Sequence, residues 1–354
     1  MQNKSQALRK LAVALTAAIA IPLPALADTA NITFYGKINV DVESVKSDKV
    51  TTPVTTATSI NRVQSNVSRF GFKGSEDLGD GLQAIFQFEA QIDSVNDKNA
   101  NTPYTGIRNS QIGLKGSFGT VFGGAWDSPY KAVHNKTELF DNGSVFTATQ
   151  LVGKSGNGKN FNTRQNNAIQ YWSPDFKGFS FKGSYGLDSA KTAADNKTAL
   201  SLSGAYENDM LHAGLGYERR LDQTTRTKHD SAIRLLGAYK LPDGQVGVML
   251  ERLSIADTIT TTANQNNIEL SATYKLGKKN LGAFLVKNGN YNNVTNSGAR
   301  QLTLRYGYSY SKRSELYAAY TSISNDTAAN YGFYAGSAAG SSQTALGLGI
   351  IHSF

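Results

Sequence analysis

Long stretches of this chain alternate between apolar and polar residues, and this period of two constrains the fold more than any other feature. The alternation is regular in residues 32–43, 82–93, 179–188 and 301–310. Successive side chains of a β-strand point to opposite faces, so the pattern predicts strands with one apolar and one polar face. These stretches match the roughly 9 to 11 residues of a tilted membrane strand, whereas ordinary strands average about 5 to 6.

Connections between the predicted strands are alternately short and long. Seven short ones fall within residues 75–81, 116–119, 173–178, 207–209, 241–244, 277–280 and 311–314. Eight long ones cover about 46–61, 94–106, 127–163, 189–197, 221–230, 254–265, 288–299 and 324–342. Fifteen connections join sixteen strands, the pattern of an antiparallel up-and-down transmembrane β-barrel. Residues 120–126 and 281–287 alternate poorly, so the prediction is about sixteen strands.

Residues 1–27 have the features of a secretory signal peptide. A basic start is followed by an apolar run from Leu11 to Ile21, which ends before the cleavage signal Ala25-Leu26-Ala27. This run of 11 residues is shorter than the roughly 17 to 25 that a membrane helix needs, which argues against an uncleaved anchor. We therefore expect residues 28–354 to form one exported all-β domain.

Composition excludes several classes of function. The signal peptide holds three of the 36 basic residues, so 33 face 27 acidic ones in residues 28–354, a net charge of +6. These bases are interspersed with acids, which argues against a nucleic-acid partner. Cysteine is absent, the four histidines lack metal-binding spacing, and no G-x-S-x-G occurs. We expect no metal, no cofactor and no enzymatic activity.

The predicted number of strands decides which face meets water. A closed sheet of about sixteen strands is too wide for side chains to fill, so it encloses a lumen. In a membrane the apolar face must point to lipid, and closure pairs every backbone donor and acceptor. Aromatic residues near the strand ends are typical of membrane-interface girdles. The polar face would therefore line a water-filled path for ions and small hydrophilic solutes.

Basic side chains are expected along this path. A charge on the lipid face would cost roughly 2 to 4 kcal/mol near the midplane, so bases on the polar face belong to the lumen. The candidate pore-lining residues are Lys37, Arg69, Lys73, Lys115, Arg164, Lys182, Arg234, Lys240 and Arg305. Alternation leaves open whether each one filters ions or is only a solvated wall residue.

The longest connection, residues 127–163, is expected to be functional because structureless loops of this length are uncommon. It carries the acidic residues Asp127, Glu138 and Asp141. Folded into the lumen, these acids would face the basic wall and set up a transverse field across the path. The alternative is a mobile external loop.

Motifs spread over the whole predicted domain resemble the trimeric general porins of the neisserial and β-proteobacterial type. They are Thr33-Phe34-Tyr35-Gly36, residues 68–79 and 81–84, Arg164 with Asn166 and Asn167, Tyr171-Trp172-Ser173-Pro174, Leu241-Pro242, Ser311-Lys312-Arg313 and the closing His352-Ser353-Phe354. The resemblance implies a sixteen-stranded barrel with periplasmic short turns and external long loops, and a third loop folded into the pore. It also implies a homotrimer among outer-membrane lipids and lipopolysaccharide, passive diffusion, and a terminal Phe354 read by outer-membrane assembly machinery.

Two departures from this family concern the pore. Ala125 and Ile351 occupy positions where family members often carry arginine, and the loss of a pore-side arginine would weaken a preference for anions.

Two other functions stay open: an adhesin that presents its long loops, and a substrate-specific channel. A sugar channel would need an aromatic slide, and otherwise the aromatic residues near the longest connection would pin that connection to the wall. These residues are Trp126, Tyr130, Phe140, Phe146 and Phe161.

Overall fold

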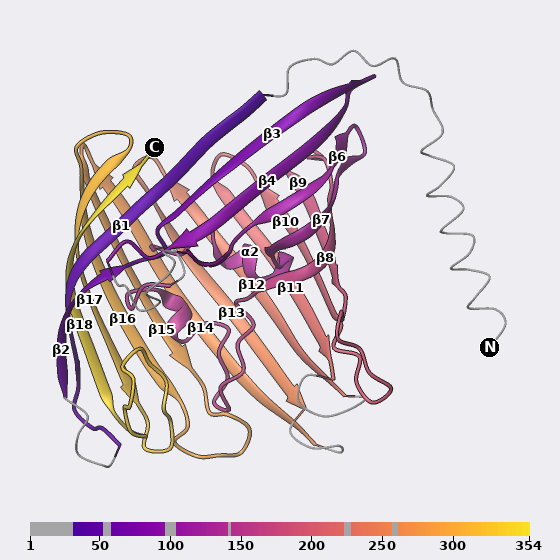
Figure 1. Cartoon of the computed structure of the whole chain (residues 1–354). Helices are drawn as coiled ribbons and strands as arrows, with labels where there is room; N and C mark the ends of the chain where they lie inside the picture. Colours follow the sequence, from indigo (N-terminus) through magenta and orange to yellow (C-terminus); the bar gives the residue numbers. More distant parts are fainter. Residues whose placement is uncertain (1–30, 52–57, 96–103, 141–142, 223–227, 257–260) are drawn as a thin grey trace.

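The computed structural model describes residues 31–51, 58–95, 104–140, 143–222, 228–256 and 261–354. The predicted signal peptide, residues 1–27, and Asp141 of the longest connection lie outside the described residues. Almost all of the regular structure is one antiparallel sheet that closes on itself (Figure 1).

The strands are β1 (Asn31–Ser47), β2 (Ser59–Ser65), β3 (Arg69–Gly79), β4 (Leu82–Ile92), β5 (Tyr104–Ile107), β6 (Ser110–Gly116), β7 (Gly119–Asp127), β8 (Arg164–Trp172), β9 (Phe179–Gly186), β10 (Ala199–Glu207), β11 (Leu211–Leu221), β12 (His229–Leu241), β13 (Gly244–Ala256), β14 (Thr262–Leu276), β15 (Lys279–Asn288), β16 (Ala299–Ser309), β17 (Ser314–Asn325) and β18 (Ser342–Ser353). Between β7 and β8 lie the helix α2 (Pro129–His134) and the short 3-10 helix η1 (Ala148–Gln150). No helix in the described part of the chain has the length and apolar composition needed to cross a membrane.

The eighteen strand segments of the described residues make sixteen barrel strands. β2 and β3 both pair with β1, and β5 and β6 both pair with β4, so each of these two couples is one interrupted strand. β1 also pairs with β18, which closes the sheet. The prediction of a sixteen-stranded antiparallel barrel is therefore confirmed.

Short and long connections lie on opposite rims, with the short ones uppermost in Figure 1. The turn between β3 and β4 shows why the short ones suffice: Asp80 and Gly81 have φ values of 51° and 76°. Positive φ at both central residues matches the right-handed twist of paired strands, so two residues close the hairpin. β3 accordingly runs to Gly79, further than the alternation indicated.

The apolar face of the sheet points outward. On β16, Leu302, Leu304 and Tyr306 are 40%, 47% and 42% exposed, whereas the intervening Gln301 and Thr303 are fully buried. This is the reverse of a soluble barrel, and it is the arrangement expected where lipid surrounds the sheet.

The poor alternation of residues 281–287 has a physical cause. Phe284 and Val286 of β15 point inward and are buried against Leu151 and Val152 of the connection between β7 and β8. An apolar side chain can occupy the inner face here because protein, not water, covers it. The connection therefore imposes its own apolar pattern on the wall.

Candidate functional site

The connection between β7 and β8, which we call the inner segment (residues 128–163), lies against inward side chains of the barrel. It begins with α2, whose cap is Ser128: the Ser128 Oγ accepts the backbone N–H of Lys131 at 3.2 Å, and Pro129 takes the first helical position. The backbone N–H of Tyr130, the residue after Pro129, donates to Ser201 Oγ of β10 at 3.0 Å. The helix therefore starts in contact with the wall.

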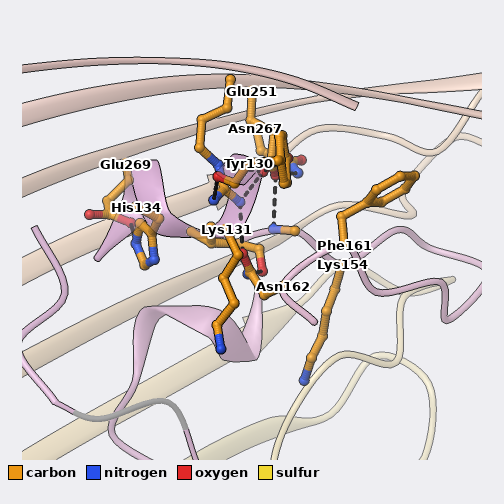
Figure 2. A network of polar contacts seen from close by, with 12 residues as sticks. Tyr130, Lys131, His134, Lys154, Phe161, Asn162, Glu251, Asn267 and Glu269 are labelled. Atoms are coloured by element: carbon orange, nitrogen blue, oxygen red, sulfur yellow. Dashed lines mark hydrogen bonds and ion pairs between the residues drawn. The ribbon is translucent and has the colours of Figure 1, made fainter. Parts of the chain in front are cut away.

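A buried carboxylate on β13, Glu251, holds two parts of the inner segment (Figure 2). Its Oε1 accepts the hydroxyl of Tyr130 at 2.5 Å, and its Oε2 accepts the backbone N–H of Gly153 at 2.9 Å. Asn267 of β14 donates to Oε2 at 2.8 Å. Arg234 of β12 lies 2.5 Å from Oε1, and neither charged side chain is accessible to solvent.

Arg234 requires a correction to the sequence prediction. Alternation placed it on the inner face, where it is, but the structure buries it completely beneath the inner segment, so it does not line open water. Its guanidinium donates to Asn162 Oδ1 at 2.9 Å and to the carbonyl of Tyr130 at 3.3 Å. Arg234 therefore anchors the segment to the wall. The alternation along β12 reports only which face a side chain lies on, so it could not show that the segment covers Arg234.

Other inward polar side chains satisfy the irregular backbone of the inner segment. Gln265 accepts the N–H of Gly156 at 2.9 Å, Asn288 donates to the carbonyl of Leu151 at 3.0 Å, and Gln301 donates to the carbonyl of Thr147 at 2.9 Å. Backbone N–H and C=O groups need such partners wherever irregular backbone is buried away from water.

The aromatic residues of the inner segment are buried rather than displayed. Tyr130, Phe146, Phe161 and Phe140 are 0%, 0%, 1% and 6% exposed. Trp126 makes edge contacts with Phe122 and with Trp172. The four buried rings pack the segment against the wall and do not form an exposed aromatic slide, whereas Trp126 belongs to β7 and contacts other rings of the wall.

The inner segment and the wall also enclose a water-accessible space of about 320 Å³, the charged hollow. Its charged lining residues are Lys37, Arg108 and Arg305 from the wall, Asp127 at the end of β7, and Lys131 and Glu138 from the segment. Four of the sequence-predicted site residues, Lys37, Asp127, Glu138 and Arg305, thus meet in one place.

Ion pairs surround the charged hollow. Glu89 accepts Arg108 Nε at 2.6 Å and lies 3.6 Å from Arg69 Nε. Asp127 accepts Lys131 Nζ at 2.8 Å and lies 3.4 Å from Arg164 Nη2. Arg69 and Arg164 are therefore linked to the hollow through carboxylates.

Arg305 completes this set. It pairs with Glu315 on β17, and its guanidinium lies 5.2 Å from the centre of the Phe140 ring. The side chain therefore joins the wall to the inner segment.

These features can be compared with known proteins. A family model described as Gram-negative porin matches residues 14–328. The chain belongs to the Gram-negative porin family. The outer membrane porin protein 32 of Delftia acidovorans is 28% identical over 343 residues, which are 92% of this chain and 94% of that protein. A major outer membrane protein P.IB of Neisseria meningitidis serogroup B is 31% identical over 291 residues, 76% of this chain and 78% of that protein.

A solved structure gives the same answer for the fold. The anion-selective porin from Comamonas acidovorans superposes with a TM-score of 0.81 at 27% identity, covering 92% of this chain and all of that one. Membership of the family identifies this porin as an outer-membrane diffusion channel and not an enzyme, as the sequence predicted.

Arg108 of this porin is a lumen residue that the sequence analysis missed. Gln91 is opposite Gly106 and Gln87 is opposite Gln111, so three residues of β4 face four on the strand formed by β5 and β6. The extra residue is a β-bulge, which re-aims side chains and breaks the alternation at Arg108. The only sequence signal that could have indicated its role is the presence of an arginine near the start of a polar strand.

The loop acids of the porin differ in their surroundings. Asp127 is held by Lys131 and Arg164 as described above. Glu138 lines the hollow, but its side chain is only 4% exposed and its oxygens accept the backbone N–H groups of Phe140 and Ala148, each at 3.2 Å. Asp127 therefore pairs with a predicted basic wall residue, Arg164, whereas Glu138 shares the hollow with Lys37 and Arg305 without an ion pair to either.

Burial raises the pKa of Glu138 to about 7. Its Oε2 lies 4.0 Å from His134 Nδ1, and His134 Nε2 lies 2.7 Å from Glu269 of β14. Burial alone would lower the pKa of His134, but the Glu269 and Glu138 carboxylates keep it above its ordinary value. The segment thus places a buried histidine between two carboxylates, Glu138 and Glu269.

Glu138→Gln is expected to flatten the pH dependence of this porin's stability. A carboxyl whose pKa is raised on folding stabilises the protein below its ordinary value near 4.5, and the contribution is lost as pH rises through about 7. The free energy of unfolding should therefore fall by up to about 3 kcal/mol more in the wild type than in the variant between about pH 5 and 8. Denaturant midpoints at both pH values test this, and equal slopes would contradict the assignment.

Four of the predicted basic residues lie away from the charged hollow. Lys240 Nζ is 2.8 Å from Glu207, beside a short turn. Lys73 and Lys115 line a second space of about 450 Å³ together with Trp172, and Lys182 Nζ lies 4.5 Å above the Trp172 ring.

Proposed function

We propose that the charged hollow is the narrowest part of the diffusion path and that it favours small anions weakly. The observation that carries the proposal is the charge balance. Six bases, Lys37, Arg69, Arg108, Lys131, Arg164 and Arg305, lie in or directly around the hollow with the four acids Glu89, Asp127, Glu138 and Glu315. The excess is two positive charges, or three when Glu138 is protonated.

The pairing of these charges explains why the preference should be weak. Most of the bases have a carboxylate within 4.0 Å, so a passing ion meets closely spaced dipoles more than isolated charges. A solute then crosses by passive diffusion in water, without a tight binding step. Burial of the segment's aromatic rings supports a general channel over a sugar-specific one. The similarity to the anion-selective porin from Comamonas acidovorans supports the sign of the preference.

The remaining expectations from the family resemblance belong to the same proposal. The mature porin would begin after residue 27, assemble as a homotrimer among outer-membrane lipids and lipopolysaccharide, and present its short turns to the periplasm. Its terminal Phe354 would be read by the assembly machinery. Size-exclusion chromatography with light scattering on the detergent-solubilised protein tests the trimer.

Neutralising Lys37 or Arg108 is expected to lower the anion-to-cation permeability ratio about fivefold, because a unit charge about 4 Å from an ion in water contributes about 1 kcal/mol. Planar-bilayer recordings of Lys37→Gln and Arg108→Gln under a salt gradient give this ratio from the reversal potential. Lys312→Gln, on an exposed short turn, is the matched control. Unchanged reversal potentials would exclude the charged hollow as the filter, and an absence of conductance would refute the channel.

A further inference from the structure

We propose that the lumen also holds a binding site for small doubly charged oxyanions, formed by Lys73, Lys115 and Lys182 with Trp172 and Gln111. We call it the lysine hollow. It is separate from the charged hollow and nearer the rim of short turns, since Lys115 and Trp172 stand at the ends of strands that enter such turns. The proposal rests on the diffusion function, because the ligand reaches the site through the lumen.

Strand register brings these residues to one face of the wall. Lys115 is opposite Thr120, Thr120 is opposite Trp172, and Trp172 is opposite Lys182, in a row that crosses β6, β7, β8 and β9. Residues directly opposite one another point to the same side of a sheet.

The second row supplies the other half of the site. Lys73 is opposite Gln87, and Gln87 is opposite Gln111. Lys115, Thr120 and Trp172 of the first row and all three residues of the second row line the same space of about 450 Å³, which is large enough for a hydrated oxyanion. Lys182 adjoins this space through its position over the Trp172 ring.

The three lysines differ from most other cations of the inner wall in having no ion pair. Among the residues that the structure describes, no carboxylate oxygen lies within 4.0 Å of the ammonium groups of Lys73, Lys115 or Lys182. Elsewhere on the wall the bases pair with acids: Arg62 with Glu43, Arg108 with Glu89, Arg164 with Asp127, Arg220 with Glu218, Arg234 with Glu251, Lys240 with Glu207 and Arg305 with Glu315. Uncompensated positive charge is therefore concentrated in the lysine hollow.

The nearest acids by register are already engaged. Glu89 pairs with Arg108 and Arg69, as described above. Asp77, which is opposite Gln83 and through it Lys115, accepts the backbone N–H of Gly79 at 2.9 Å within the turn. Asp77 keeps its negative charge in that hydrogen bond, but neither it nor Glu89 forms an ion pair with the three lysines, so the ammonium groups can still pair with a ligand.

The remaining side chains suit an oxyanion. Lys182 is held over the Trp172 ring, and a half-buried ammonium placed in this way has fewer conformations to lose when it binds an anion. The buried Oε1 of Gln111 has no hydrogen-bond partner, so nothing fixes the orientation of this amide through that atom, and a rotated amide would present its NH2 group, the donor that an oxyanion needs. Ammonium groups bind phosphate-type oxygens as point charges with three donors each, which needs no fixed fork geometry.

The test is competition between phosphate and chloride in single channels of the intact porin. At about pH 8, where inorganic phosphate is mostly a dianion, phosphate should reduce the chloride current in a saturable way. Lys73→Gln/Lys115→Gln should raise the half-blocking phosphate concentration at least tenfold, because each removed charge contributes about 1 kcal/mol at close range. Lys182→Gln alone should raise it about fivefold, and Lys312→Gln should leave it unchanged.

The outcomes separate this proposal from the function on which it rests. Open channels with an anion preference but no saturable phosphate block, or equal block in the double variant and the wild type, overturn the lysine hollow and leave the diffusion function standing. Channels that never open overturn both. If the double variant does not fold, the single Lys182→Gln recording decides.

Discussion

Glu251→Ala is expected to lower the free energy that holds the inner segment to the wall by about 3 to 5 kcal/mol, because the buried charge of Arg234 would be left without its partner. Arg234 is fully buried and has no route to water. The same change removes the acceptor for the Tyr130 hydroxyl and for the Gly153 N–H, so both ends of the segment's contact with β13 fail together.

Single-channel recording should show this loss directly. A segment held by fewer contacts samples more positions, so each pore of the variant should switch among more conductance levels than a pore of the wild type. The temperature at which the folded barrel converts to its unfolded form on a denaturing gel should fall as well. Asp209→Ala, at an exposed turn between β10 and β11, is the matched carboxylate deletion and should change neither.

A double replacement distinguishes an ion-pair anchor from simple packing. Arg234→Leu/Glu251→Leu removes both charges and fills the site with apolar atoms, which is often neutral for a buried pair. The double variant should therefore be more stable than Glu251→Ala and should switch among fewer conductance levels in the bilayer. A double variant that is worse than the single one would assign the contact to side-chain shape and refute the role of the charge.

The barrel itself was predictable because lipid and water impose opposite requirements on the two faces of each strand. In residues 301–310, Leu302 and Leu304 face outward while Gln301 and Thr303 face inward, as the period of two indicates. Two-residue turns such as the one at Asp80 carry their own local signal. Each of these inferences depends only on neighbours along the chain.

The lumen was less predictable because its contents depend on contacts between distant segments. Arg234 and Arg305 satisfy the same alternation, yet one is sealed beneath the inner segment and the other lines the charged hollow. Phe284 breaks the alternation because Leu151 and Val152 lie in the same apolar cluster, more than a hundred residues earlier in the chain. A period read along one strand reports the side on which a residue lies, and it carries no information about what covers it.

Bulges are the second reason why the sequence does not predict which residues face the lumen. Each bulge adds a residue to one strand and so shifts the alternation of inward and outward positions. Val67 has a φ of 58°, at the point where the β2–β3 strand gains a residue relative to β1. Past such a residue the parity of inward positions changes, as it does at Arg108. Sequence alternation therefore loses its phase at the level of the barrel where the charged hollow lies.

Removal of the Phe354 side chain is expected to lower the yield of folded barrel in cells about tenfold or more, because this residue contributes to folding in two separate ways. The first is closure of the sheet. Gly36 and Phe354 exchange both backbone hydrogen bonds, each 3.0 Å long, where the last residue of the chain meets β1. The Phe354 ring also covers Gly36 so closely that a Cβ there would lie 2.2 Å from the ring. The second contribution is the proposed reading of the terminal aromatic residue by assembly machinery.

Gly36→Ala separates the two contributions, because it disturbs closure and leaves the terminal signal intact. Its methyl group would collide with the Phe354 ring and destabilise the barrel by roughly 1 to 3 kcal/mol. Gly36→Ala/Phe354→Ala relieves that collision, so the double variant should refold into detergent micelles better than Gly36→Ala alone. In cells the order should reverse, since only the double variant lacks the terminal ring. The same order in both assays would place the whole effect of Phe354 in the closure of the sheet and leave no role for its recognition.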